Sequence, residues 1–426
     1  MNGALDVLSG DVLVRDGRIT AVGRIGSERA DRIVNAGGGY LLPGFIQTHV
    51  HLCQTLFRGH ADDLALLEWL KQRIWPMEAA HTPSSLAAAA RLAAAELLLG
   101  GTTSVLTMET VHDTEAVFEA LETSGLRAVV GKCMMDGDSS VPSRLFEQTQ
   151  HSIDESVGLA ARWHGKANGR LMAAFAPRFA PTCTRELLEA VGEISKARGL
   201  LIHTHASENR DEIALVQSLT GQQNVAYLEH VGLASSRLCL AHCVWVDDRE
   251  QDLLARHDVK VLHCPGSNLK LASGIAPVVA MRRRGVCVSL GADGAACNNQ
   301  LDMFAEMRLA TGLQAITRGA GALRAADALH MATRDGARTL GLETEIGSIE
   351  VGKRADLILI DRDRPHLATP SDPVSAIVYS ARPADVRTTI VDGRILVDDF
   401  KLVAEDMSEI ITTARTEADA LARRAF

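Results

Sequence analysis

The segment GFIQTHVH, residues 44–51, is a β-rich run that ends in two histidines two positions apart. Seven further runs of this kind follow it, at residues 102–108, 127–136, 170–179, 200–208, 238–243, 259–265 and 286–293. Stretches with helical spacing lie between them, for example residues 184–197, 247–257 and 278–284. Near-continuous apolar strands that alternate with helices indicate a parallel sheet, and eight repeats predict an α/β fold closed as a TIM-type (β/α)₈ barrel.

The two ends of the chain have a different pattern. Residues 11–23 (DVLVRDGRITAVG) and 388–397 (TTIVDGRILV) alternate around Asp-Gly turns, and residues 349–361 (IEVGKRADLILID) alternate in the same way. These are strand and hairpin signatures. We therefore expect residues 1–42 and 347–402 to form one composite β-sandwich domain beside a barrel of residues 43–346. Residues 404–426, rich in Ala, Glu and Arg, predict a C-terminal helix.

Composition narrows the possible partners and compartment. The 426 residues suit one barrel with an accessory domain, and the formal net charge of -9, without a basic patch, argues against nucleic acid and anionic membranes as partners. No signal peptide is visible, and the most apolar stretch, residues 86–99, is an Ala-rich helix interrupted by Arg91 and Glu96 and too short to span a bilayer. Eight scattered cysteines without a CxxC pair predict reduced, buried thiols in a cytoplasmic protein.

Polar residues recur where the predicted strands end, which is where barrel enzymes carry their functional groups. They are His49, His51, His203, His205, His242, His263 and Asp293. Residues two apart on a strand point the same way, so both histidines of the first strand can face one point. Any one of these residues alone is best explained as a hydrogen-bonded core residue, but buried polar groups on five of eight strands require partners. A shared metal ion explains them together, and imidazole with carboxylate suits zinc or iron(II).

Five motifs carry a resemblance to a known family: LPGFIQTHVHLCQTLFRG (42–59), HTHASENRDE (203–212), LAHCVWV (240–246), HCPGSNLKLASGIAP (263–277) and LGADGAACNNQLDMFAEMRLA (290–310). Over nearly its whole length the chain resembles the amidohydrolase superfamily, in the aminohydrolase branch of S-adenosylhomocysteine/5'-deoxyadenosine deaminases, guanine-type deaminases and triazine hydrolases. The resemblance implies one divalent ion, Zn²⁺ or alternatively Fe²⁺, on His49, His51, His205 and Asp293. It also implies a homo-oligomer.

The fourth predicted strand supports one ion over two. Dinuclear members of the superfamily usually bridge their metals with a lysine from this strand, and here RLMAAFAPRF (170–179) has none. Lys132 lies on the third strand instead, where we expect a charge near a strand end or a contact with substrate.

Mechanism follows from these ligands. A bound divalent metal lowers the pKa of its water toward neutrality. Glu208, three residues after His205, is placed to move a proton from that water to a ring nitrogen and then to the leaving amine. A helix N-terminal acid is the alternative for Glu208. His242 matches the family histidine that orients the water, and Asp293 serves as ligand and proton acceptor. We expect His203 and His263 to be supporting residues.

Two groups of motifs favour different substrates, and they disagree at Arg178. The motifs at 267–277 and 293–310 look like those of adenosine-type nucleoside deaminases, in which a histidine after the fourth strand helps to hold the ribose. Here Arg178 occupies that place, and PRFAPTC (177–183) looks more like guanine-type deaminases, in which an arginine donates to a ring carbonyl. A structural ion pair is the other reading of Arg178.

Other residues are candidates for substrate contacts: Gln54, Glu78 and Trp75. Glu78 could equally be a solvated helix acid. Trp69 and Trp75 belong to a possible apolar lid that would stack on a flat heterocycle, whereas we expect Trp245 in the core.

The sequence thus predicts hydrolytic deamination of an amino-substituted nitrogen heterocycle, a small-molecule substrate. A purine- or pterin-like base with an adjacent carbonyl is the first choice. Nucleosides of the S-adenosylhomocysteine, methylthioadenosine or 5'-deoxyadenosine type come second, and a triazine hydrolase comes third. A non-enzymatic metal-binding module is a further alternative, against which the intact ligand set with Glu208 argues.

Overall fold

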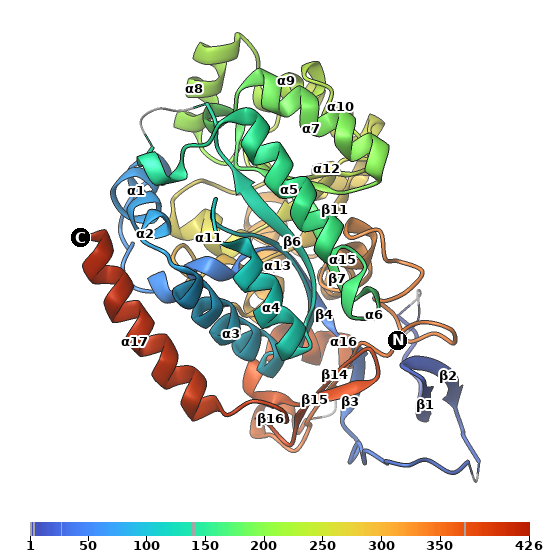
Figure 1. Ribbon diagram of the computed structural model, residues 1–426. Coiled ribbons are helices and arrows are strands. Elements are labelled where there is room, and N and C mark those ends of the chain that lie inside the picture. The colour runs from blue at the N-terminus through green and yellow to red at the C-terminus, as the bar shows by residue number, and fades with distance from the viewer. Residues whose placement is uncertain (1, 3–4, 27, 138–140, 370–371) are drawn as a thin grey trace.

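A curled parallel sheet surrounded by helices forms the body of the molecule in the computed structural model, which describes residues 2, 5–26, 28–137, 141–369 and 372–426 (Figure 1). Its strands, in chain order, are β4 (Phe45–His51), β5 (Thr102–Met108), β6 (Arg127–Met134), β7 (Leu171–Pro177), β8 (Ile202–Ala206), β9 (Leu238–His242), β10 (Lys260–His263), β11 (Cys287–Leu290) and β12 (Asp293–Gly294). Their spatial order, β11-β10-β9-β8-β7-β6-β5-β4-β12, follows the sequence except at β12. All eight predicted strand runs are confirmed.

The sheet closes where the last strand meets the first. β11 and β12 are two parts of the eighth strand, and β12 pairs with β4 through Asp293 opposite Val50 and Gly294 opposite His51. Thr48 Oγ1 also donates a hydrogen bond to the carbonyl oxygen of Leu290, at 3.0 Å. Closure places the carboxyl ends of β4, β8, β9 and β12 around one mouth.

Helices follow the strands as predicted, including those expected at residues 86–99, 184–197, 247–257 and 278–284. They are α3 (Pro83–Leu99), α4 (Thr114–Ser124), α5 (Thr149–Trp163), α7 (Arg185–Arg198), α8 (Arg210–Thr220), α9 (Asn224–His230), α10 (Asp248–Arg256), α11 (Pro265–Lys270), α12 (Val278–Arg283), α13 (Met303–Arg318), α14 (Ala325–Met331) and α15 (Arg334–Thr339). A further helical segment after β4 consists of η1 (Leu52–Phe57), α1 (Leu66–Trp69), the π-helical η2 (Leu70–Ile74) and α2 (Trp75–Ala79).

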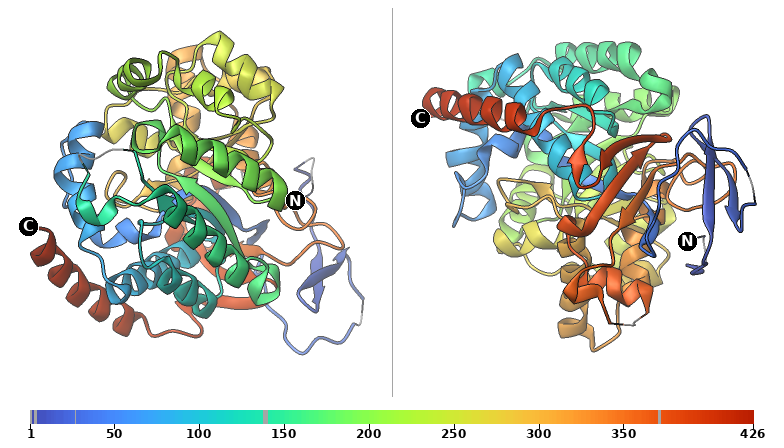
Figure 2. Two further views of the ribbon diagram at one scale, coloured as in Figure 1. Left: turned by 45° about the horizontal axis from the view of Figure 1, so that its top comes forward. Right: turned by 90° about the horizontal axis from the view of Figure 1, so that it is seen from below.

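Strands from both ends of the chain form a second, antiparallel sheet, as expected. Its order is β16 (Lys401–Leu402), β15 (Arg394–Asp398), β14 (Val386–Val391), β13 (Leu357–Ile360) and β3 (Tyr40–Pro43). The hairpin of β1 (Asp11–Arg15) and β2 (Arg18–Gly23) lies beside this sheet and buries Ile19 against Ile349 and Leu357 (Figure 2). The hairpin turn places Asp16 and Gly17 at positive φ, which the Asp-Gly pair predicts.

One part of the terminal pattern was predicted wrongly. Residues 349–361 alternate like a strand throughout, but only Leu357–Ile360 forms one. The preceding part makes a turn around Gly352, at φ 94°, and its backbone bonds to the β2 residue Ile19 at Gly352 N and Lys353 O. Ile349 and Ala355 are buried in one cluster with the hairpin residue Ile19, whereas Val351 is 66% exposed, so the alternation does not mark a strand in this part.

The C-terminal helix α17 (Met407–Ala425) lies along α3, where Arg91 Nε is 2.9 Å from Glu405 Oε1 (Figure 1). The helix begins at Met407, three residues after the predicted start at residue 404, and Asp406 caps it.

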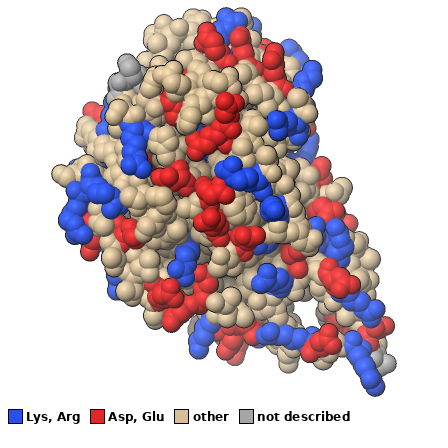
Figure 3. Space-filling view, in the orientation of Figure 1, with Lys and Arg blue, Asp and Glu red and all other residues tan. Residues whose placement is uncertain are grey.

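The cysteine prediction is confirmed in its structural part, since all eight thiols are free and buried. In the part of the chain that the structure describes, no helix is both long and apolar enough to cross a membrane. Charges of both signs are interspersed on the face in Figure 3.

Candidate active site

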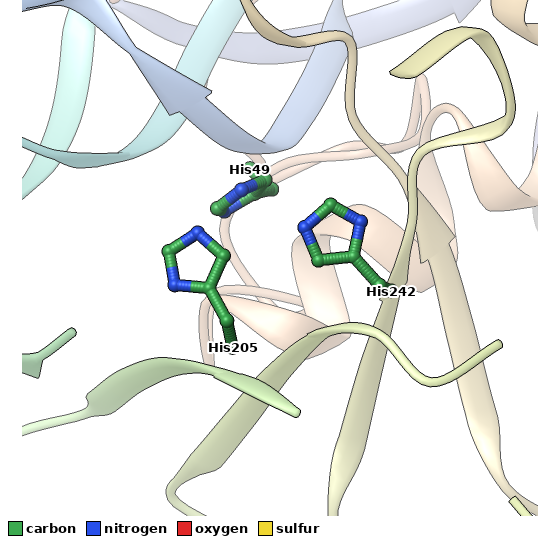
Figure 4. A group of neighbouring side chains, drawn as sticks. All are labelled: His49, His205 and His242. Atoms are coloured by element: carbon green, nitrogen blue, oxygen red, sulfur yellow. The ribbon is translucent and has the colours of Figure 1, made fainter. Parts of the chain in front are cut away.

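Four predicted ligands come together at the barrel mouth. Asp293 Oδ1 lies 3.2 Å from His49 Nε2 and 3.3 Å from His51 Nε2, and His205 Nε2 lies 3.4 Å from His51 Nε2. The rings of His49, His205 and His242 come from three strands and face a common centre (Figure 4).

The donor set fits a divalent metal. Nδ1 of His51 donates to the carbonyl oxygen of Met108 at 2.8 Å, and Nδ1 of His205 donates to that of Arg178 at 2.7 Å. In the neutral rings the Nε2 atoms therefore carry the lone pairs, and these atoms face one another and a carboxylate. His49 Nε2 is buried without a hydrogen-bond partner. A cation is the partner that converging lone pairs and a carboxylate require.

Burial also sets the protonation that ligands need. It lowers the pKa of His49 to about 4 and that of His205 well below its usual value, so both imidazoles are neutral. Burial would raise the pKa of Asp293, but His49 and His51 together hold it well below its usual value. Two neutral imidazoles and an ionised carboxylate are the forms that bind metals.

His242 lies between the ligand carboxylate and the predicted proton carrier. Its Nε2 is 3.5 Å from Glu208 Oε2 and 3.9 Å from Asp293 Oδ2, while its Nδ1 donates to Asn268 Oδ1 at 2.9 Å. His242 and Asp293 both have left-handed backbones, with φ of 74° and 66°. Non-glycine residues in this region are strained, and such strain concentrates at functional sites.

Glu208 is buried beside the cluster, and burial raises its pKa to about 7. Ser273 Oγ donates to its Oε1 at 3.3 Å. The alternative role as helix N-terminal acid belongs to Glu212 instead: α8 starts at Arg210, and the Glu212 carboxylate accepts the backbone N–H of Glu208 at 2.7 Å. The Glu208 carboxyl is thus left for chemistry at the pocket.

A small pocket opens above the ligands. It is lined by His51, Gln54, Leu66, Trp69, Leu70, Arg178, Phe179, His205, Glu208, Leu271 and Asp293. The predicted substrate residues Arg178 and Gln54 therefore line it, and Glu78 lies behind both. The helical segment after β4 contributes Leu66, Trp69 and Leu70 as an apolar wall. Trp75 is buried but is not among the lining residues.

Arg178 is held in an ion pair. Its Nη1 lies 2.5 Å from Glu78 Oε2 and its Nη2 lies 3.2 Å from Glu78 Oε1, with both side chains buried. Gln54 Nε2 donates to the same Glu78 Oε1 at 3.0 Å. Glu78 is therefore a buried partner of Arg178, not a solvated helix acid.

Lys132, His263 and Trp245 were also singled out in the sequence, and none of them lines this pocket among the described residues. Lys132 is buried against Glu147, 2.6 Å away, and does not line the pocket. His263 is buried, and among the described residues neither of its ring nitrogens has a hydrogen-bond partner. Trp245, expected in the core, is 37% exposed, and the guanidinium of Arg210 lies over its ring.

The segment 267–273, part of a motif that carries the family resemblance, supplies hydrogen bonds to the site. Ser267 Oγ donates to Asp293 Oδ2 at 2.7 Å, Asn268 bonds to His242 and Ser273 bonds to Glu208. One loop and short helix after β10 thus orient three site residues. The available signal was three polar residues in the segment that follows a strand ending at the mouth.

Known proteins resemble this chain in sequence over nearly its full length. It is 40% identical over 421 residues to a 5'-deoxyadenosine deaminase of Methanosarcina acetivorans, covering 99% of this chain and 95% of the relative. It is 42% identical over 432 residues to a 5-methylthioadenosine/S-adenosylhomocysteine deaminase of Symbiobacterium thermophilum, with 99% and 97% covered.

Solved structures resemble it in fold. An adenosine deaminase from Xanthomonas campestris with bound zinc has a TM-score of 0.88 at 34% identity, covering 97% of this chain and 93% of that one. A zinc complex of atrazine chlorohydrolase from Arthrobacter aurescens has 0.90 at 25%, with 96% and 94% covered. The guanine deaminase of E. coli has 0.83 at 29%, with 91% and 92% covered.

The family comparison agrees with the geometry, since the sequence matches the amidohydrolase family over residues 40–396. A closed barrel with a metal-type donor set at its mouth, and relatives of 40% identity along the whole chain, lead to one conclusion. The chain belongs to the amidohydrolase family and is a metal-dependent hydrolase.

Proposed function

We propose that this enzyme hydrolytically deaminates adenosine-type nucleosides, with 5'-deoxyadenosine and methylthioadenosine as the leading substrates. The observation that carries the proposal is a buried carboxyl, Glu208, beside a metal-type donor set, in a chain whose relatives are named as deaminases of these nucleosides. The reaction adds water across the amino-bearing ring carbon, C6 of adenine. That carbon gains a C=O bond, loses its C–N bond and releases ammonia.

This order of substrates differs from the one that the sequence alone favoured. A guanine-type base was the first choice because Arg178 was expected to donate to a ring carbonyl. Both terminal nitrogens of Arg178 face the Glu78 carboxylate instead, which supports the ion-pair alternative. The relatives of 40–42% identity carry nucleoside names, while the guanine deaminase neighbour is 29% identical.

We assign one divalent ion per chain, zinc first and iron(II) second, to His49, His51, His205 and Asp293. When bound there, such an ion lowers the pKa of a water and polarises it for attack. The Asp293 Oδ2 atom and His242 Nε2 face the same space, 3.9 Å apart, so both can accept or direct a proton of a water placed between them.

Glu208 moves the protons in this proposal. With a pKa of about 7, its carboxyl changes protonation readily near neutral pH. It takes one proton from the attacking water and donates it to the ring nitrogen next to the carbon under attack, which makes that carbon more electrophilic. After water has added, Glu208 takes a proton from it and passes it to the amine, which leaves as ammonia.

Several broader assignments complete the proposal. We divide the chain into a barrel of residues 43–346, a composite β-sandwich of residues 1–42 and 347–402, and a terminal helix. We further propose a homo-oligomer that works in the cytoplasm, a compartment that suits eight free thiols.

The test is ammonia release by the zinc-loaded enzyme on a panel of 5'-deoxyadenosine, methylthioadenosine, adenosine, guanine, a pterin and an aminotriazine. We expect the three nucleosides to give the highest kcat/KM. Faster turnover of guanine or the triazine would overturn the substrate assignment, and no ammonia from any compound with metal bound would overturn the deaminase proposal.

A Glu208→Gln variant tests the proton carrier. We expect it to bind zinc normally and to lose roughly 10²–10⁴-fold in kcat, since that is the usual contribution of a positioned acid–base group. Unchanged kcat would remove Glu208 from the mechanism.

A further inference from the structure

A second group of potential metal ligands lies apart from the active-site pocket. One ligand atom from each of His112, Glu147 and Glu155 lies within 4.8 Å of the others, and none of these residues lines that pocket. His112 lies two residues before α4, Glu147 lies two residues before α5, and Glu155 belongs to α5. The group therefore connects the segments that follow β5 and β6, and it shares no residue with the cluster at the barrel mouth.

Lys132 is a cation that already lies beside this group. Its three N–H bonds have three acceptors: Glu147 Oε2 at 2.6 Å, the carbonyl oxygen of Cys133 at 3.2 Å and Ser152 Oγ at 3.5 Å. Glu155 Oε2 is 3.6 Å from the ammonium nitrogen and receives no hydrogen bond from it. One ammonium thus faces two carboxylates, and only one of them is hydrogen-bonded to it.

Two carboxylate oxygens of the group are shielded from water and have no hydrogen-bond partner among the described residues. They are Glu147 Oε1, on a side chain that is 1% exposed, and Glu155 Oε2. Of the other cationic side chains nearby, Arg144 pairs with Asp113 at 3.4 Å. His151 Nδ1 lies 3.5 Å from Glu147 Oε1, and it carries a charge only when the ring is protonated. Buried carboxylate oxygens without partners are costly, and a bound cation satisfies them.

His112 adds an imidazole lone pair to these oxygens. Its Nε2 donates to the carbonyl oxygen of Arg144, because a carbonyl can only accept, so Nδ1 carries the lone pair of the neutral ring. The rings of His51 and His205 are oriented by the same kind of bond to a backbone carbonyl. One imidazole and two carboxylates, with a position left for water, suit zinc, whereas Mg²⁺ and Ca²⁺ take oxygen ligands.

We propose that His112, Glu147 and Glu155 bind a second zinc ion, in addition to the ion assigned to the barrel mouth. The two ions share no ligand, so the second one lies outside the hydrolytic centre and does not depend on the proposed function. It holds the segment before α4 against the start of α5. The site has three protein ligands and adjoins the Lys132 ammonium, so we expect it to bind zinc at least about 100-fold more weakly than the barrel mouth does.

The first experiment counts zinc sites by calorimetric titration of the full chain after removal of all metal with a chelator. The parent should bind about two equivalents per chain in two affinity classes. Asp293→Ala, which removes a ligand at the barrel mouth, should keep the weaker class. Absence of that class from both proteins would overturn the inference. Absence of the tighter class from the parent, with the weaker class present, would refute the metal assignment at the barrel mouth instead.

The second experiment replaces the ligands one at a time. His112→Ala and Glu155→Gln should each weaken the second class by at least about 10-fold and leave the tighter class within about threefold of the parent value. His151→Ala, which removes the adjacent histidine outside the group, is the matched control and should change neither class by more than about threefold. An equal loss in all three variants, with circular dichroism confirming that they are folded, would overturn the assignment of these ligands.

The third experiment locates the ion directly, by anomalous diffraction at the zinc edge from crystals of the full chain grown with zinc. We expect a peak within about 2.3 Å of one atom from each of His112, Glu147 and Glu155, since zinc binds nitrogen and carboxylate oxygen at about 2.0–2.2 Å. No peak between these residues would contradict the proposal, whatever is found at the barrel mouth.

Discussion

A single hydrogen bond orients the ring of His49, one of the four proposed metal ligands. His203 Nε2 lies 2.7 Å from His49 Nδ1, and in the tautomer in which His49 donates this hydrogen bond the lone pair of its Nε2 faces Asp293. Partners of this kind usually change metal affinity by about 10–100-fold. We therefore expect His203→Phe to weaken zinc binding by that factor, measured by competition with a chromophoric chelator.

His263→Phe is the matched control for this experiment. His263 is equally buried at the end of β10, but neither of its ring nitrogens has a hydrogen-bond partner among the described residues. Its replacement should change zinc affinity by less than about threefold. Equal losses in the two variants would mean that His203 acts through general packing.

The position of a site residue was predictable where the period and the end of its strand determine it. His49 and His51 follow from the two-residue period of a strand that ends at the barrel mouth. The partner of Arg178 was not predictable, because Glu78 lies 100 residues away on a helix whose orientation depends on tertiary packing. The sequence favoured Arg178 as a donor to a substrate carbonyl, but in the fold it pairs with the Glu78 carboxylate.

Elements are joined by buried carboxyl groups as well as by apolar contacts. Glu250 of α10 accepts the backbone N–H of Val225, in the first turn of α9, at 2.9 Å. Burial raises the Glu250 pKa from 4.5 to about 7. A carboxyl whose folded-state pKa is raised stabilises the protein fully below pH 4.5, and this contribution is lost as the pH rises through about 7.

Glu250→Gln should therefore be more stable than the parent at pH 8, by about 2 kcal/mol, and equally stable near pH 4.5. The amide oxygen still accepts from Val225, so only the charge is removed. Urea unfolding at the two pH values measures the difference. Glu193→Gln, at an exposed position of α7, is the control and should show no such pH dependence. A pH-independent difference at position 250 would contradict the burial argument.

A strand was predictable where its own apolar sequence pattern determines that it forms. The barrel strands are buried on both faces, so their apolar runs identify them directly. At residues 349–361 the same alternation failed, because Ile349 packs on the hairpin residue Ile19 from a turn. Val351 of that pattern is 66% exposed, and the turn around Gly352 joins the hairpin through a β-bridge between Arg18 and Arg354, so alternation alone did not identify a strand before Leu357.

At the scale of the whole molecule, the candidate ligands join parts of the barrel that are distant in sequence. They belong to β4, β8 and β12, and β12 with β4 forms the closure of the sheet. An ion there opposes opening of that closure, so binding should stabilise the folded chain as a whole. At a zinc concentration of about 1,000 times the dissociation constant, the gain is roughly 4 kcal/mol.

Removing the metal should consequently lower the Tm by roughly 5–10 °C, measured by calorimetry on zinc-loaded and chelated enzyme, and re-addition of zinc should restore it. Asp293→Ala removes the carboxylate shared by His49 and His51, so its Tm should respond little to zinc. Glu208→Gln, which leaves the four ligands intact, should respond like the parent. Only a ligand set that spans β4 and β12 makes metal binding stabilise the closed barrel. A Tm that does not change on chelation, or a full zinc response in Asp293→Ala, would therefore show that the ion does not join these two strands.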